Sequence, residues 1–198
     1  MKFFSLATLF LALSSISIAQ NDNNMNQPPY YEIPESPSAV GSGAIMSRMI
    51  DGLGFRYYWA TESLVQEDLD FRFTEESRSS LETCTHIFDL SNVILCAAKQ
   101  IAVEKAKAPE DFEALRRKTL ENFQEASALM LNYSDEELEQ CKLVFGSGSN
   151  ATTYPIWNLI NGPIEDVVWH AGQIVSMRRA SGNPFNSKAS VLSGKVRD

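Results

Sequence analysis

The residues of this chain best suited to chemistry are two histidines and one aspartate. Asp166 and His170 lie four positions apart in the stretch NGPIEDVVWHAGQIVSMRRASGNP, and His86 lies in a second long apolar segment. Side chains four residues apart on a helix project from the same face. Two imidazoles and a carboxylate on facing helices can hold a divalent metal ion such as zinc or nickel, with coordination positions left open. His86, Asp166 and His170 are therefore the predicted metal ligands.

This spacing admits two functional interpretations. A divalent ion lowers the pKa of a coordinated water toward neutrality, which indicates a metal-dependent hydrolase or transferase. Alternatively, the three side chains form a hydrogen-bonded cluster in which Asp166 orients an imidazole, as aspartate–histidine pairs often do on helices. The chain would then be a non-catalytic ligand-binding or structural protein. The sequence identifies neither a catalytic residue nor a substrate, and it contains no nucleophile elbow, phosphate loop, dinucleotide fingerprint or His-Glu-x-x-His motif.

The elements that must position these side chains are predicted to be four amphipathic helices. Apolar residues recur at helical spacing over residues 44–63, 79–101, 110–131 and 161–181. For the last helix, Asn161 is the expected cap, with Pro163 in the first turn and Gly182 at the end. Strand signals are scarce. The pattern predicts an all-α four-helix bundle with one crossover connection.

The N-terminal region is predicted to be a targeting segment followed by a leader. Residues 1–19 combine Lys2, a short apolar run and a small-residue cleavage site, which is typical of a signal peptide. Residues 20–41 are polar and rich in proline and are expected to be disordered, and residues 42–198 form the domain. The protein is therefore expected to be exported, either periplasmic or secreted. No later apolar stretch is long enough to span a bilayer, and no cysteine follows the cleavage site to carry a lipid anchor.

Charge and composition narrow the choice of partners. The formal net charge is −8, and no cluster of basic and aromatic residues stands out against it. Nucleic acid and anionic membranes are thus poor partners, since both carry negative phosphates. The remaining expectation is a small molecule of unknown identity.

The three cysteines leave at least one thiol unpaired. Cys84 and Cys96 are twelve residues apart on one predicted helix, about 18 Å, which exceeds the reach of a disulfide. Any bridge would join Cys141 to one of them, and the alternative is three buried free thiols.

Arg178 and Arg179 are expected to interact with the carboxyl end of their helix, with the binding of a substrate anion as the alternative.

Three segments resemble the DinB/YfiT-like family over residues 42–184: GFRYYWATESL, HIFDLSNVIL and WHAGQIVSMRRASGNP. The resemblance implies a four-helix bundle in an up-down-down-up arrangement, frequently dimeric, in which three histidines bind a divalent metal. His86 and His170 match two of these ligands, whereas Asp166 stands where the family usually has the third histidine. Members of the family include thiol-dependent transferases and isomerases, so the resemblance implies metal-dependent chemistry and a homodimer.

Overall fold

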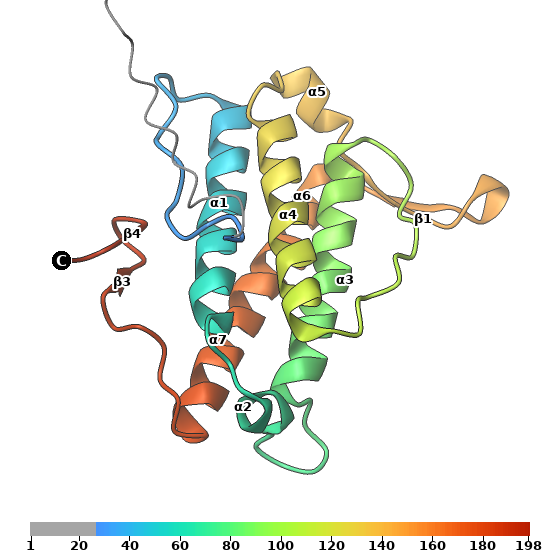
Figure 1. Cartoon of the computed structure of the whole chain (residues 1–198). Coiled ribbons are helices and arrows are strands. Elements are labelled where there is room, and N and C mark those ends of the chain that lie inside the picture. The colour runs from blue at the N-terminus through green and yellow to red at the C-terminus, as the bar shows by residue number, and fades with distance from the viewer. Residues whose placement is uncertain (1–26) are drawn as a thin grey trace, which may run out of the picture.

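The computed structural model describes residues 27–198, which are mainly helical, and the predicted signal peptide lies outside these residues. Four helices of sixteen to twenty residues lie side by side (Figure 1). They are α1 (Ser42–Thr61), α3 (Ser80–Ala98), α4 (Phe112–Met130) and α7 (Glu165–Ala180). The prediction of a mainly helical fold is confirmed. Among the described residues, no helix combines the length and the apolar character needed to cross a membrane.

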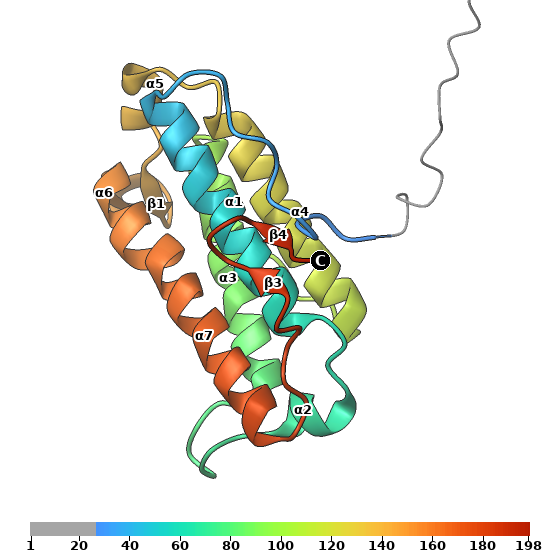
Figure 2. The same ribbon diagram turned by 90° about the vertical axis from the view of Figure 1, so that its left-hand side faces the viewer.

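The four long helices form a closed ring of neighbours. Both α1 and α3 pack against α4 and α7. The chain runs in one direction along α1 and α7 and in the opposite direction along α3 and α4 (Figures 1 and 2). Because α3 and α4 are consecutive and parallel, residues 99–111 must return along the length of the helices, and Figure 1 shows this connection beside α3. The helix pattern predicts one crossover in a longer connection but does not place it, and the structure has it in the short segment 99–111.

Side-chain caps fix where the two middle helices begin. The hydroxyl of Ser79 accepts a hydrogen bond from the backbone of Glu82, and the Glu82 carboxylate accepts one from the backbone of Ser79. At α4, the carboxylate of Asp111 accepts a hydrogen bond from the backbone of Ala114. These caps satisfy amide groups that have no partner in the first turn of a helix.

The last helix begins earlier than predicted. Its first turn is α6 (Ile156–Leu159), which continues through a π-helical turn, η3 (Ile160–Ile164), into α7. Pro163 lies within the π turn, and since proline has no amide hydrogen it cannot make the regular helical hydrogen bond. The predicted cap at Asn161 is therefore wrong. The predicted end is confirmed, because Gly182 follows α7 with a φ of +99°.

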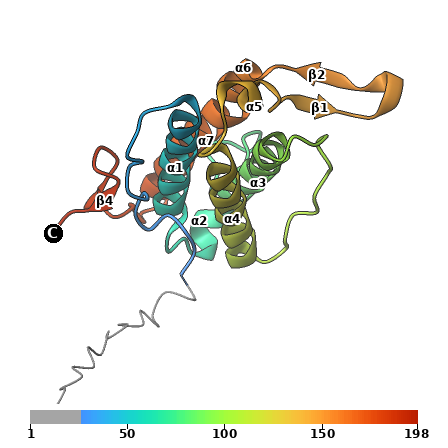
Figure 3. The same cartoon turned by 90° about the horizontal axis from the view of Figure 1, so that it is seen from above.

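Short elements lie in the connections between the long helices and in the segment that follows α7. The antiparallel pair β1 (Leu143–Phe145) and β2 (Thr152–Tyr154) projects beyond the helices, as seen from above in Figure 3. The others are α2 (Gln66–Asp70), α5 (Asp135–Glu139), η2 (Gly148–Asn150) and the hairpin of β3 (Ala189–Ser190) with β4 (Lys195–Val196). The helix pattern of the sequence gives no indication of the C-terminal hairpin.

The core lies between the four long helices and is apolar. Fully buried side chains come from each helix, including Ile50, Ile87, Phe123 and Ile174. The three cysteines are buried free thiols, as in the second alternative above. Burial raises the pKa of the Cys84 thiol to about 12 and that of Cys141 to about 11, so neither is poised as a nucleophile.

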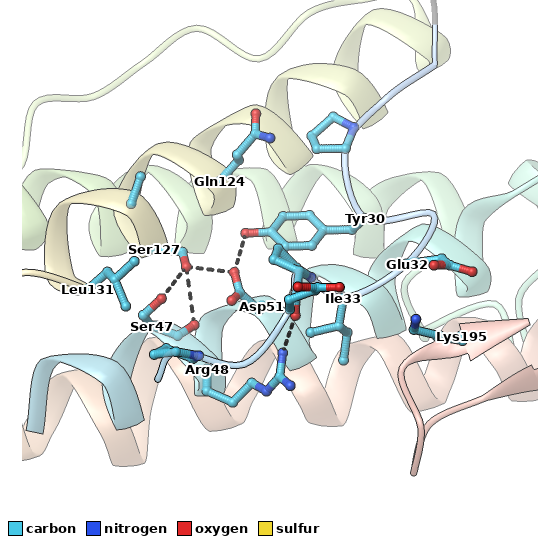
Figure 4. Close-up of a pocket in the computed structure, with 15 residues that line it drawn as sticks. Tyr30, Glu32, Ile33, Ser47, Arg48, Asp51, Gln124, Ser127, Leu131 and Lys195 are labelled. Atoms are coloured by element: carbon cyan, nitrogen blue, oxygen red, sulfur yellow. Dashed lines mark hydrogen bonds between the residues drawn. The ribbon is translucent and has the colours of Figure 1, made fainter. Parts of the chain in front are cut away.

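The described part of the N-terminal leader, residues 27–41, is packed against the helices and is called here the N-terminal strap. Tyr30 is only 5% exposed, and its ring lies where a side chain at Gly54 would be, since a Cβ there would collide with the ring. Its hydroxyl donates a hydrogen bond to Asp51 (Figure 4). A pocket of about 540 Å³ lies between this strap, α1 and α4. The packing of this segment differs from the disordered leader that its composition suggests.

Candidate metal centre

The three predicted ligands converge between α3 and α7. One side-chain donor atom from each of His86, Asp166 and His170 lies within 4.8 Å of the other two. The Nε2 atom of His86 is 3.5 Å from Oδ2 of Asp166, and the Nε2 atom of His170 is 3.3 Å from Oδ1. The single carboxylate therefore lies between two imidazole nitrogens.

The packing of α3 against α7 explains this convergence. Near the start of α3, the buried hydroxyl of Ser80 contacts the sulfur of Met177 at 3.3 Å. The two helices run in opposite directions (Figure 1), so residues further along α3 meet residues earlier in α7. Six residues on from Ser80 is His86, and seven residues back from Met177 is His170. The two imidazole rings accordingly meet edge to face, with centroids 4.8 Å apart.

The cluster lies at the edge of the core. The side chains of His170, His86 and Asp166 are 12%, 29% and 42% exposed, so the imidazole of His170 is the deepest of the three groups. Apolar residues on the inner side of α7, including Val167, Ala171 and Ile174, are fully or almost fully buried. The arrangement places the nitrogen ligands against the core and leaves the carboxylate accessible to solvent.

The electrostatic surroundings favour a neutral imidazole at His86. Partial burial lowers the pKa of His86, and the positive charge of Arg78 and the neighbouring His170 act in the same direction. The nearby Asp166 carboxylate opposes this shift. Because only an unprotonated ring nitrogen can bind a metal ion, a lowered pKa keeps His86 competent as a ligand over a wider pH range.

A fourth side chain, which the sequence pattern does not identify as functional, touches the cluster. The Oε1 atom of Gln173 lies 2.6 Å from Nδ1 of His170, on the opposite side of the ring from Asp166. Gln173 comes three residues after His170 on α7. This spacing was the signal in the sequence that could have predicted the contact, since residues three apart on a helix are neighbours.

Arg178 is a structural residue. Its side chain is almost completely buried, and Nη1 donates hydrogen bonds to the carbonyl oxygens of Trp59, Ala60 and Glu62 at the end of α1. Arg178 thus neutralises the carboxyl end of α1. The sequence pattern instead predicted an interaction with the carboxyl end of its own helix, α7. Arg179 is exposed, and its guanidinium lies 5.3 Å from the ring centre of Phe185.

Comparison of this chain with protein-family models, curated proteins and solved structures finds no match.

Proposed function

We propose that this chain is an exported DinB/YfiT-like protein that binds one divalent metal ion through His86, Asp166 and His170. One observation carries the proposal. The imidazoles of His86 on α3 and of His170 on α7 converge on the carboxylate of Asp166. The family resemblance supports the same residues, with aspartate in place of one histidine. The arrangement of α1, α3, α4 and α7 agrees with the four-helix bundle that the resemblance implies.

The two distances at Asp166 are long for hydrogen bonds and are compatible with a metal site. Hydrogen bonds between nitrogen and oxygen usually measure about 2.7–3.2 Å, and both contacts of Asp166 are longer, at 3.3 and 3.5 Å. Around a tetrahedral zinc ion with bonds of about 2.0–2.2 Å, two ligand atoms lie about 3.3–3.5 Å apart. Each of the two separations at Asp166, one to each carboxylate oxygen, falls in this range, and the three donor atoms lie within 4.8 Å of one another.

The donor set also suits the charge of such an ion. Two neutral imidazoles and one carboxylate bring a single negative charge, and histidine and carboxylate ligands are typical of catalytic zinc sites. A divalent ion bound here supplies Lewis-acid chemistry, with positions left for water and substrate. Asp166 offsets part of its charge, and the exposed side of the carboxylate gives a small substrate access. A metal-dependent hydrolase fits an exported protein better than a transferase that consumes a cytosolic thiol.

Metal stoichiometry tests the proposal directly. The protein is incubated with zinc, desalted and subjected to elemental analysis, alongside His170→Ala and the matched control Glu165→Gln. Glu165 is an exposed acid next to Asp166 that takes no part in the cluster. We expect about one zinc ion per chain in the wild type and in the control, and none in His170→Ala.

Two outcomes would contradict the proposal. Stoichiometric zinc retained by His170→Ala would refute the ligand assignment. A wild-type protein that binds no zinc, nickel or manganese, and whose thermal stability does not change when these ions are added, would support the non-catalytic binding or structural protein.

A further inference from the structure

Gln173 makes a directed contact with the deepest of the three predicted ligands. Its side-chain oxygen is 2.6 Å from Nδ1 of His170, a short hydrogen bond between two partly buried side chains. An amide oxygen can only accept hydrogen bonds, so the proton in this contact belongs to Nδ1. In a neutral imidazole only one ring nitrogen carries a proton, and Nε2 is then left with an unshared electron pair.

This electron pair lies at the cluster. The Nε2 atom of His170 is 3.3 Å from an oxygen of Asp166, which is itself an acceptor. Two acceptors at this distance repel each other unless a positive charge lies between them. The hydrogen bond from Nδ1 to Gln173 therefore leaves His170 in the form that can donate its electron pair to a metal ion.

We infer that Gln173 is a positioning residue, which holds His170 in the Nδ1-protonated tautomer and fixes the ring so that Nε2 faces the metal. The inference rests on the proposed metal-binding function and assigns to it a residue outside the ligand set. A partner on the second ring nitrogen of a ligating histidine fixes the tautomer and raises the basicity of the ligand.

His86 provides an internal comparison. Among residues 27–198, no hydrogen bond is recorded to Nδ1 of His86, and its ring approaches the carboxylate through Nε2 alone. A substitution at Gln173 should therefore change the tautomer of His170 and leave that of His86 as it was.

Two variants separate the acceptor from the bulk of the side chain. Gln173→Leu keeps a similar volume but removes the acceptor, whereas Gln173→Glu retains an oxygen that can accept the proton of Nδ1. The tautomers of both histidines are read from long-range proton–nitrogen correlation spectra of the metal-free protein at a pH of about 8.5, where imidazoles are neutral. Zinc affinity is then measured by competition with a chelator.

In the wild type and in Gln173→Glu we expect the Nδ1-protonated form of His170. In Gln173→Leu we expect a substantial Nε2-protonated population together with zinc binding that is weaker by about 10–100-fold. A partial recovery of affinity in Gln173→Glu relative to Gln173→Leu would show that the acceptor is responsible.

An Nε2-protonated His170 in the metal-free wild type would overturn the inference, as would an unchanged tautomer and unchanged zinc affinity in Gln173→Leu. A wild type that shows the expected tautomer but binds no metal would refute the proposed function and leave the role of Gln173 in the tautomer intact. The spectra of the metal-free protein thus distinguish the two failures.

Discussion

Asp51 and Asp166 are both carboxylates between packed elements of the same small protein, but they differ in what their oxygens meet. One oxygen of Asp51 accepts hydrogen bonds from the hydroxyls of Tyr30 and Ser127, at 3.1 and 2.6 Å (Figure 4). The oxygens of Asp166 instead face two imidazole nitrogens at 3.3 and 3.5 Å. Asp51 is buried, whereas the side chain of Asp166 is 42% exposed.

Asp51 is a structural carboxylate, whereas Asp166 is a proposed metal ligand. Hydroxyl protons satisfy Asp51 within the protein, and the positive charge of Arg48 acts on it favourably. The hydrogen bonds to Asp51 therefore join the N-terminal strap and α4 to α1. Asp166 instead faces the Nε2 atoms of two imidazoles, which is the arrangement proposed above to bind a divalent ion.

The largest expected effect is the response to zinc. If Asp166 is a ligand, zinc at about 100 times its dissociation constant raises the free energy of unfolding by about 2.7 kcal/mol, because the ion binds only the folded chain. Asp166→Ala should lose this increment and Asp51→Asn should keep it. Chemical denaturation with and without zinc measures both. Equal increments in the two variants would erase the proposed difference between the carboxylates.

A smaller effect is expected at the hydroxyl that serves Asp51. Tyr30→Phe removes one donor to a buried carboxylate and should lower the free energy of unfolding by about 1–3 kcal/mol, with zinc affinity unchanged. Tyr31→Phe is the matched control, because Tyr31 is 40% exposed and no hydrogen bond to its hydroxyl is recorded among the described residues. Similar losses in both variants, measured by urea denaturation, would show that Asp51 does not depend on Tyr30.

The convergence of the three proposed ligands could be predicted because it depends mainly on regular helix geometry. The chain has only two histidines. The four-residue spacing places Asp166 and His170 on the same face of their helix, wherever that helix lies in the fold. The remaining step, that His86 faces them, follows from the neighbouring packing of α3 and α7. The mainly helical fold was predictable for the same reason, since amphipathic periodicity determines which faces of a helix are buried.

Features that depend on contacts between distant residues could not be predicted. Tyr30 is held because Gly54, more than twenty residues away, leaves space for its ring, whereas the local composition of polar residues and proline suggests disorder. Arg178 is buried because the carbonyl groups that end α1 lie beside it, and nothing in its own helix indicates this. The π turn at Pro163 depends on a helix that had already begun at Ile156, where the sequence offers no side-chain cap.

The pH dependence of stability gives the smallest and most specific difference between the two carboxylates. Burial raises the pKa of Asp51 above its ordinary value of 3.8, against the opposing effects of Ser127, Tyr30 and Arg48. In the interval between that ordinary value and the raised one, the folded protein binds a proton that the unfolded chain does not, so folding becomes more favourable as the pH falls. Asp51→Asn keeps an acceptor for both hydroxyls but cannot take up this proton. The stability of the wild type relative to this variant, followed by urea denaturation from about pH 7 to pH 4, should therefore rise as the solution is acidified. A difference that stays constant over this range, or falls, would mean that the buried carboxylate titrates as an ordinary aspartate, and the contrast with the exposed Asp166 would then rest on hydrogen bonding alone.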